Sequence, residues 1–232
     1  MNPPPRFPAI FYLGLIFSLL ALPRLPAQDE SLSPNVNKPY KNPNAEKTAK
    51  SYERENRDVV QNKDKIVAAC QLKPGLDVAD IGAGTGLFTR PFAAKVAPDG
   101  KVYAVEITKP FLEYIEKTCK EQGIKNVEGV FSTPTSAKLP AESIDVAFIC
   151  DTYHHFEYPY KMLDSIFTAM RPGGRLIIVD YEREEGISPK WVFGHVRADK
   201  KTVIEEVTKA GFTFVDEVDL MKIQYVIRFV KK

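Results

Sequence analysis

From residue 77 onward, short apolar runs alternate with stretches in which apolar residues recur at helical spacing. Apolar runs of this length predict buried strands, and the helical spacing predicts amphipathic helices between them. The predicted strands are 77–81, 102–107, 127–131, 145–150 and 175–180. The predicted helices between them are 88–96, 110–122 and 160–170. Regular alternation of strand and helix is typical of βαβ units, and therefore of a parallel sheet.

The two ends of this pattern differ from its middle. Residues 45–70 are charged and helix-favouring, so one or two helices are expected before the first strand. After a helix at 200–210, the apolar runs 212–218 and 224–230 are separated by a short connection, which predicts an antiparallel pair. The predicted fold class is α/β, a doubly wound and mostly parallel sheet with a C-terminal antiparallel hairpin.

The first 27 residues have a different character. Arg6 precedes an apolar run, residues 9–22, that prolines bracket on both sides. A run of this length falls short of the roughly 20 residues that span a bilayer, and it is typical of a secretory signal. Residues 1–27 are therefore predicted to be a signal peptide, cleaved after Ala27, or an N-terminal anchor in which residues 9–22 tether the chain to a membrane.

The predicted location follows from this leader. The protein is expected to be exported, periplasmic or extracellular, or to be anchored to a membrane, and a cytoplasmic location is the alternative. Residues 28–44 are polar and contain three prolines, which indicates a linker or an extended arm. The globular domain is therefore predicted to span residues 45–232.

Composition and charge narrow the classes of partner. The chain has 232 residues, of which 44% are hydrophobic and 27% charged, as expected for one globular domain. Without Arg6 and Arg24 of the leader, the 32 basic residues become 30, which equals the number of acidic residues. This balance gives no indication of nucleic-acid binding. The spacing of the three cysteines fits neither a metal site nor a disulfide framework, so reduced and buried thiols are expected.

A glycine-rich turn directly follows the first predicted strand. Gly82, Gly84 and Gly86 occupy alternate positions, and Asp80 lies two residues before the first of them. Glycines at a strand-to-helix turn allow the backbone to approach a ligand closely, which indicates a nucleotide-like ligand. The spacing is GxGxG and not the GxGxxG of dinucleotide-binding proteins.

A second acidic position supports a nucleotide-like ligand. Glu106 ends the second predicted strand, 20 residues beyond Gly86. A carboxylate at the tip of this strand can accept hydrogen bonds from both hydroxyl groups of a ribose.

In this order, these motifs resemble those of the class I S-adenosylmethionine-dependent methyltransferases, which have a Rossmann-like fold. The resemblance implies that S-adenosyl-L-methionine is the cofactor, and it extends from about Tyr52 to the C-terminus. It assigns the methionine part of the cofactor to Gly82, Gly84 and Gly86, with Asp80 orienting the loop and the cofactor's amino group. It assigns the ribose to Glu106.

The sequence departs from the family after the third strand, where many members have an acid that meets the adenine. Hydroxyl side chains stand there instead, and Thr135 is taken as the cofactor-binding residue, with Thr133 and Ser136 as alternatives.

The segment after the fourth predicted strand, Cys150 to Phe156, is the expected active-site edge, because ligands bind outside the carboxyl ends of strands where the strand order reverses. It resembles an Asp-x-Tyr-His-His-Phe loop of a methyltransferase subgroup. Asp151, His154 and His155 are the candidate catalytic bases for removing a proton from the methyl acceptor. The alternative is that one histidine only packs against, or caps, the next helix.

A metal site is the other interpretation of this segment, with His195 as a further ligand. Adjacent histidines on a loop rarely face one metal, so no metal is predicted. His195 and Trp191 belong to an insertion before the last helix, which is expected either to cover the pocket or to face solvent.

The predicted function is methyl transfer from S-adenosylmethionine to a small molecule, with an apolar acceptor favoured by Tyr153, Phe156 and Tyr158. A nicotinamide-dependent oxidoreductase is the first alternative, and the GxGxG spacing argues against it. A non-catalytic cofactor-binding protein is the second.

Overall fold

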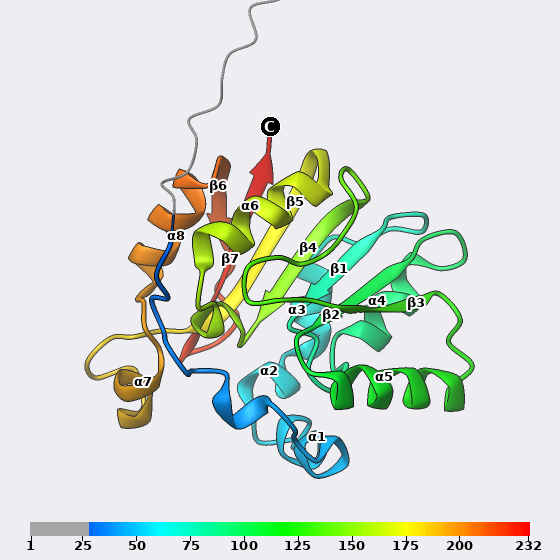
Figure 1. The fold of residues 1–232 in the computed structure, drawn as a ribbon, viewed down its shortest axis with the longest axis horizontal. Helices are drawn as coiled ribbons and strands as arrows, with labels where there is room; N and C mark the ends of the chain where they lie inside the picture. The colour runs from blue at the N-terminus through cyan, green and yellow to red at the C-terminus, as the bar shows by residue number, and fades with distance from the viewer. Residues whose placement is uncertain (1–27) are drawn as a thin grey trace, which may run out of the picture.

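Seven strands form one sheet in the computed structural model, which describes residues 28–232 (Figure 1). Their order is β3-β2-β1-β4-β5-β7-β6. Strands β1 to β5 pair in parallel, and β7 is antiparallel to both β5 and β6, which confirms the predicted fold class. The strands are β1 Val78–Ile81, β2 Val102–Glu106, β3 Val127–Phe131, β4 Ile144–Cys150, β5 Met170–Tyr181, β6 Phe212–Glu217 and β7 Gln224–Lys231.

Helices flank both faces of this sheet. The α-helices are α1 Ala45–Tyr52, α2 Asp58–Gln61, α3 Lys63–Ala69, α4 Thr89–Val96, α5 Lys109–Glu121, α6 Pro159–Ala169, α7 Lys190–His195 and α8 Lys200–Lys209. Two 3₁₀ helices are η1 Lys38–Tyr40 and η2 Tyr153–His155. The region before β1 contains three α-helices where one or two were expected. The break between α2 and α3 falls at Asn62, whose backbone N–H and side-chain amide both donate to the backbone oxygen of Asp58.

Alternate residues of the central strands pack against different helix layers. Ala79 and Ile81 of β1 belong to a buried cluster that includes residues of α6 and α8. Val78 of β1 and Phe148 of β4 face the opposite layer, where α3 and α4 contribute to a second cluster. The ring of Phe148 lies 4.9 Å from that of Phe92 in α4. Burial on both faces explains why these strands read as continuous apolar runs.

One strand begins earlier than the sequence indicated. The fifth strand was predicted to begin at residue 175, but β5 begins at Met170. Met170 pairs with Ile144, and the ladder resumes five residues later where Arg175 pairs with Val146. Gly173 has a φ of +77°, which allows the chain to bulge out between these two pairs.

Residues 28–44 lie against the domain as an extended arm. The backbone N–H of Leu32 donates to the carbonyl of Glu157 over 2.9 Å, and the Asn37 amide donates to the carbonyl of His155 over 3.0 Å. The arm therefore reaches the loop that follows β4. Among residues 28–232, no helix combines the length and apolarity needed to cross a membrane. The apolar run 9–22 lies outside the described residues.

The strand order reverses between β1 and β4, which are neighbours in the sheet although two strands and two helices separate them in sequence. The connection from β1 leads to β2 on one side, and the connection from β4 leads to β5 on the other. Loops that leave adjacent strands in opposite directions open a crevice at the carboxyl edge of the sheet. The loops after Ile81 and Cys150 border this crevice.

Candidate active site

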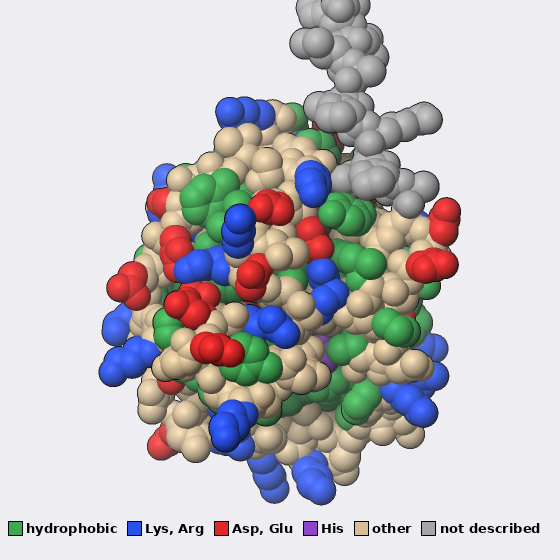
Figure 2. Space-filling view, turned by 90° about the vertical axis from the view of Figure 1, so that its left-hand side faces the viewer, with side chains coloured by type: hydrophobic (Ala, Val, Ile, Leu, Met, Phe, Trp, Pro, Cys, Tyr) green, Lys and Arg blue, Asp and Glu red, His purple; other side chains and the backbone are tan. Residues whose placement is uncertain are grey.

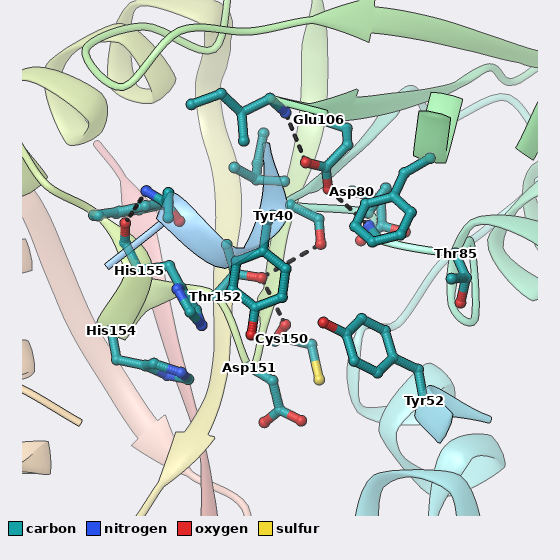
Figure 3. A pocket seen from close by; sticks show the side chains of 18 of the residues that line it. Tyr40, Tyr52, Asp80, Thr85, Glu106, Cys150, Asp151, Thr152, His154 and His155 are labelled. Atoms are coloured by element: carbon teal, nitrogen blue, oxygen red, sulfur yellow. Dashed lines mark hydrogen bonds between the residues drawn. The ribbon is translucent and has the colours of Figure 1, made fainter. Parts of the chain in front are cut away.

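A cavity of about 380 Å³ lies at the carboxyl ends of β1, β2 and β4 (Figure 3). Its wall combines the glycine loop, the tip of β2, the loops after β3 and β4, and parts of the arm and of α7. Most of the site residues expected from the sequence meet here: Asp80, Gly82, Gly84, Glu106, Asp151, His154 and His155.

Gly82 and Gly84 line the cavity and have no side chain between the backbone and a ligand. Their φ angles are +72° and +53°, in the left-handed region that favours glycine. A Cβ atom on Gly82 would lie 2.2 Å from Cγ2 of Thr152, so the loops after β1 and β4 touch only because position 82 has no side chain. The Gly84 backbone N–H donates to Glu106 over 2.9 Å.

Gly86, which the resemblance assigned to the cofactor, packs against α4 and α5. It is absent from the cavity wall that residues 28–232 form. A Cβ atom at this position would lie 2.9 Å from Arg90 and 3.0 Å from Ile115, a residue of α5. Gly86 therefore permits close packing against α5 at its φ of +82°, although its neighbours Thr85 and Leu87 line the cavity.

Asp80 is buried beneath the loop and links β1 to the start of α4. Its carboxylate accepts a hydrogen bond from the Thr89 hydroxyl over 2.6 Å. Burial raises the pKa of Asp80 to about 7, and the nearby Glu106 carboxylate adds to this. This position fits the expected role of orienting the loop.

Glu106 is held rigidly by the backbone around it. Its side chain accepts from the backbone N–H groups of Gly84, Ile107 and Thr108, over 2.9, 2.7 and 3.1 Å. Burial raises its pKa, and these three donors work against that shift. A buried carboxylate fixed in this way presents its remaining lone pairs to the cavity, as recognition of ribose hydroxyls requires.

In the loop after β3, the residues that line the cavity lie closer to the end of β3 than Thr135, the residue predicted to contact the adenine. Ser132, Thr133 and Pro134 line the cavity, whereas Thr135 is not part of the wall that the described chain forms. The backbone N–H of Thr133 donates to the carbonyl of Ser136 over 3.0 Å, so the loop turns back immediately after its first residues. Among the hydroxyl residues proposed for this loop, Thr133 lines the cavity formed by residues 28–232 and Thr135 does not.

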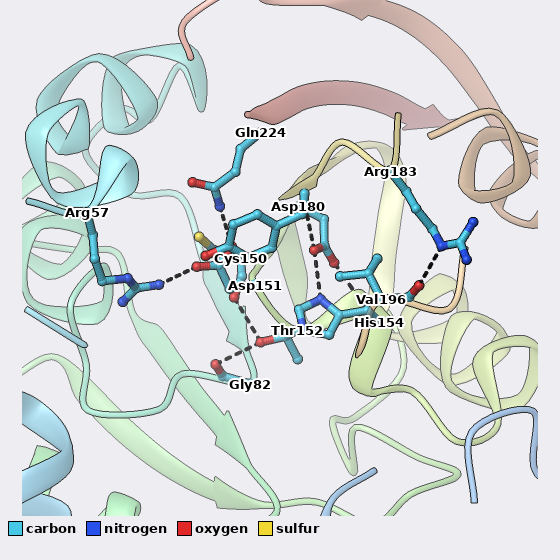
Figure 4. Close-up of polar contacts among 11 residues, drawn as sticks. Arg57, Gly82, Cys150, Asp151, Thr152, His154, Asp180, Arg183, Val196 and Gln224 are labelled. Atoms are coloured by element: carbon cyan, nitrogen blue, oxygen red, sulfur yellow. Dashed lines mark hydrogen bonds and ion pairs between the residues drawn. The ribbon is translucent and has the colours of Figure 1, made fainter. Parts of the chain in front are cut away.

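Asp151 is engaged by two partners that the sequence motif did not contain (Figure 4). Arg57 forms an ion pair with one carboxylate oxygen, and the Gln224 amide donates to the other. Burial raises the pKa of Asp151 to about 6, although Arg57 opposes this rise. With both oxygens occupied and a φ of +50°, Asp151 fixes the start of the loop after β4.

His154 and His155 lie together at the end of the cavity away from the glycine loop (Figure 3). Nδ1 of His154 is 2.7 Å from Oδ1 of Asp180, and the Asp180 carboxylate raises the pKa of His154 against the opposing effect of burial. Burial and the neighbouring imidazoles lower the pKa of His155 to about 3. The ring centroid of His195 lies within 5.1 Å of both other rings.

Several residues that line the cavity were not predicted from the sequence. Tyr40, Tyr52 and Arg57 come from the segments before β1, which carry no recognisable motif. The guanidinium carbon of Arg57 lies 5.6 Å from the centre of the Tyr52 ring. The sequence predicts that the residues before the first strand form helices. It does not show that these helices lie across the carboxyl edge of the sheet.

Comparison with known proteins identifies the domain. Residues 79–178 match the family model described as a methyltransferase domain. The ubiquinone/menaquinone biosynthesis C-methyltransferase UbiE of Ectopseudomonas mendocina (strain ymp) is 29% identical over 113 residues, or 48% of this chain and 44% of that protein. The demethylmenaquinone methyltransferase of Lactococcus lactis subsp. lactis (strain IL1403) is 32% identical over 108 residues, or 46% and 42%. The chain thus spans less than half the length of these curated relatives.

A solved structure extends the likeness to nearly the entire fold. A S-adenosylmethionine-dependent methyltransferase from Aquifex aeolicus superposes with a TM-score of 0.73 at 24% identity, covering 80% of this chain and 98% of that one.

The sheet order is that of the fold of class I S-adenosylmethionine-dependent methyltransferases. Within this fold, residues 79–178 carry the match to the methyltransferase-domain model. The family implies S-adenosylmethionine as cofactor, and the site fits it. Gly82 and Gly84 line the cavity without side chains, and Glu106 is a carboxylate fixed at its edge by the Gly84 backbone N–H.

Proposed function

We propose that the protein transfers a methyl group from S-adenosylmethionine to a small, apolar acceptor. The observation that carries this proposal is the continuity of the cavity. One wall joins a glycine-loop end suited to the cofactor to an end formed by aromatic rings and imidazoles. A reaction between two bound molecules needs both of them in one such space, held in line.

The residues at the glycine-loop end would hold the cofactor. The backbone at Gly82 and Gly84 would lie against its methionine part, with Asp80 orienting that loop, and Glu106 would accept hydrogen bonds from its ribose. When bound, S-adenosylmethionine supplies an electrophilic methyl group. The chain itself contributes binding and orientation, and it excludes water from the space between the two molecules.

The opposite end of the cavity favours an apolar acceptor with at least one ring. The rings of Tyr181 and Trp191 meet edge to face with centroids 4.8 Å apart, and both residues line the cavity. Trp191 is 50% exposed, so it stands at the mouth of the cavity with a free surface. The names of the two curated relatives, which refer to ubiquinone, menaquinone and demethylmenaquinone, support an acceptor of this kind.

Transfer of an isotope-labelled methyl group tests this function directly. The full chain is incubated with labelled S-adenosylmethionine and a panel of phenolic and quinol acceptors, and label is counted in the organic extract. Acceptor-dependent transfer is expected. Label that never leaves the cofactor, despite cofactor binding, would favour the non-catalytic alternative.

The Trp191→Ala variant tests the acceptor end of the cavity. Loss of an aromatic contact of roughly 0.5–1.5 kcal/mol predicts a KM for the acceptor that rises about 3- to 10-fold. Binding of S-adenosylhomocysteine should stay unchanged. The matched control is Phe193→Ala, because Phe193 lies on the same helix, is 36% exposed and does not belong to the cavity wall that residues 28–232 form. Equal effects of the two variants would contradict the assignment.

We also propose that residues 1–27 act as an export signal or membrane anchor, on the basis of their sequence alone. The mass of the protein recovered from a fractionated host distinguishes the possibilities. A chain beginning at Gln28 outside the cytosol indicates cleavage and export, and an intact chain in the membrane fraction indicates an anchor. An intact chain in the cytosolic fraction would contradict both.

A further inference from the structure

All three histidines of the sequence meet at one place in the structure. His154 and His155 belong to η2, after β4, and His195 is the last residue of α7. Each ring offers one nitrogen atom, and these three nitrogen atoms all lie within 4.8 Å of one another. The centroids are 4.4 Å apart for His154 and His155, and 5.0 and 5.1 Å from these two rings to His195. Two distant segments thus converge on one point.

The innermost imidazole is already oriented as a metal ligand requires. Nδ1 of His154 is 2.7 Å from Oδ1 of Asp180, whose carboxylate also accepts from the backbone N–H groups of His154 and Tyr181. A proton held on Nδ1 by this carboxylate leaves the lone pair of His154 on Nε2. A carboxylate behind the ligating imidazole is the usual outer partner of histidines at metal sites.

The second imidazole has a polar atom without a partner. Nδ1 of His155 is buried and makes no hydrogen bond within the part of the chain that the structure describes. Buried polar groups are nearly always satisfied, so an atom left in this way indicates a missing ligand or water. The ring itself is fixed on its other side by an edge contact with Tyr40, at a centroid distance of 5.2 Å.

We infer that His154, His155 and His195 bind one divalent transition-metal ion, with zinc as the best match to three neutral imidazoles. Zinc–nitrogen bonds of about 2.1 Å place tetrahedral ligands about 3.4 Å apart, so nitrogens that now lie within 4.8 Å of one another must approach by up to about 1.4 Å. His195 can supply this movement, because it is exposed and ends a short helix. Figure 2 views the side of the molecule where α7 and α8 lie, and it shows histidine atoms at the surface between hydrophobic side chains. An ion therefore has a path to them from solvent.

Three protein ligands leave one tetrahedral position open, as in catalytic and not structural zinc sites. All three histidines line the cavity, so the open position would face the acceptor end. An acceptor with an oxygen or nitrogen atom could bind there. Metal binding itself does not depend on the proposed methyl transfer, and it is measured without any turnover.

The test uses the full chain, free of any affinity tag, after treatment with a chelator. Calorimetric titration with zinc chloride is expected to give one site per chain, and cobalt(II) is expected to give the intense visible absorption of a tetrahedral complex. His195→Ala should abolish this absorption. Phe193→Ala, on the same helix and outside the cavity wall that the described residues form, should leave it unchanged. Asp180→Asn should weaken zinc binding about 10- to 100-fold through His154.

Two results would overturn the inference. One is the absence of zinc binding by folded wild-type protein, and the other is equal zinc affinity in the wild type and in His195→Ala, which would place the metal elsewhere. Far-UV circular dichroism confirms that each variant is folded, and His155→Asn serves as a second ligand variant if His195→Ala does not fold. Titration of the same samples with S-adenosylhomocysteine separates failure of the metal site from failure of the cofactor site.

Discussion

Gly82→Ala is expected to lower the free energy of unfolding by about 2–5 kcal/mol and to remove cofactor binding. A φ of +72° costs a residue with a Cβ roughly 1–2 kcal/mol, and an overpacked contact costs roughly 1–3 kcal/mol. The new Cβ would lie 2.2 Å from Cγ2 and 2.9 Å from Cβ of Thr152, so no rotation of that side chain relieves the clash. Urea denaturation measures the loss of stability.

Two further variants separate the two causes of the expected loss of stability, which are backbone strain at positive φ and the steric clash with Thr152. Gly123→Ala has nearly the same φ, +69°, but its Cβ meets nothing within 4 Å among residues 28–232, so it should show the strain alone. Thr152→Gly in the Gly82→Ala background removes the atoms that collide and should recover part of the loss. If Gly82→Ala were no more harmful than Gly123→Ala, the loops after β1 and β4 could not be in the contact described.

Glu106→Gln is expected to weaken the binding of S-adenosylhomocysteine about 10- to 100-fold, since hydrogen bonds to a charged group contribute roughly 1.5–3 kcal/mol. The substitution keeps the size of the side chain. It also turns an amide N–H₂ towards the backbone N–H groups that Glu106 now accepts from, those of Gly84 or of Ile107 and Thr108. Isothermal titration calorimetry measures the change in affinity.

Glu128→Gln is the matched control for this variant. Glu128 lies on the neighbouring strand β3, is exposed, and pairs only with Lys101 at the surface among the described residues. Its removal should leave the affinity unchanged. Wild-type affinity in Glu106→Gln would show that this carboxylate does not contact the cofactor.

The segment from Val78 to Val96 could be predicted well because its signals are local. An apolar strand, alternate glycines and a helical repeat lie within 20 residues, and each fixes the backbone without distant partners. The same signals could not show which glycine faces the ligand. All three loop glycines have positive φ, yet only Gly82 and Gly84 line the cavity, whereas a Cβ on Gly86 would meet Arg90 and Ile115.

The rest of the site depends on contacts between segments far apart in sequence. Asp151 is held by Arg57, 94 residues earlier, and by Gln224, 73 residues later, and neither partner belongs to a motif. His195 reaches the other two histidines only because α7 folds over the carboxyl edge of the sheet. His195 was a possible metal ligand by sequence, but adjacent histidines on a loop rarely share a metal. Sequence spacing does not show that η2 and α7 bring all three rings together.

Isothermal titration of the full chain with S-adenosylhomocysteine, beside nicotinamide adenine dinucleotide, tests the central claim most directly. The structure predicts one site per chain with micromolar or tighter affinity for S-adenosylhomocysteine, and no heat of binding from the dinucleotide. Folded protein that ignores S-adenosylhomocysteine, or that binds the dinucleotide instead, would contradict the assignment of this cavity to S-adenosylmethionine.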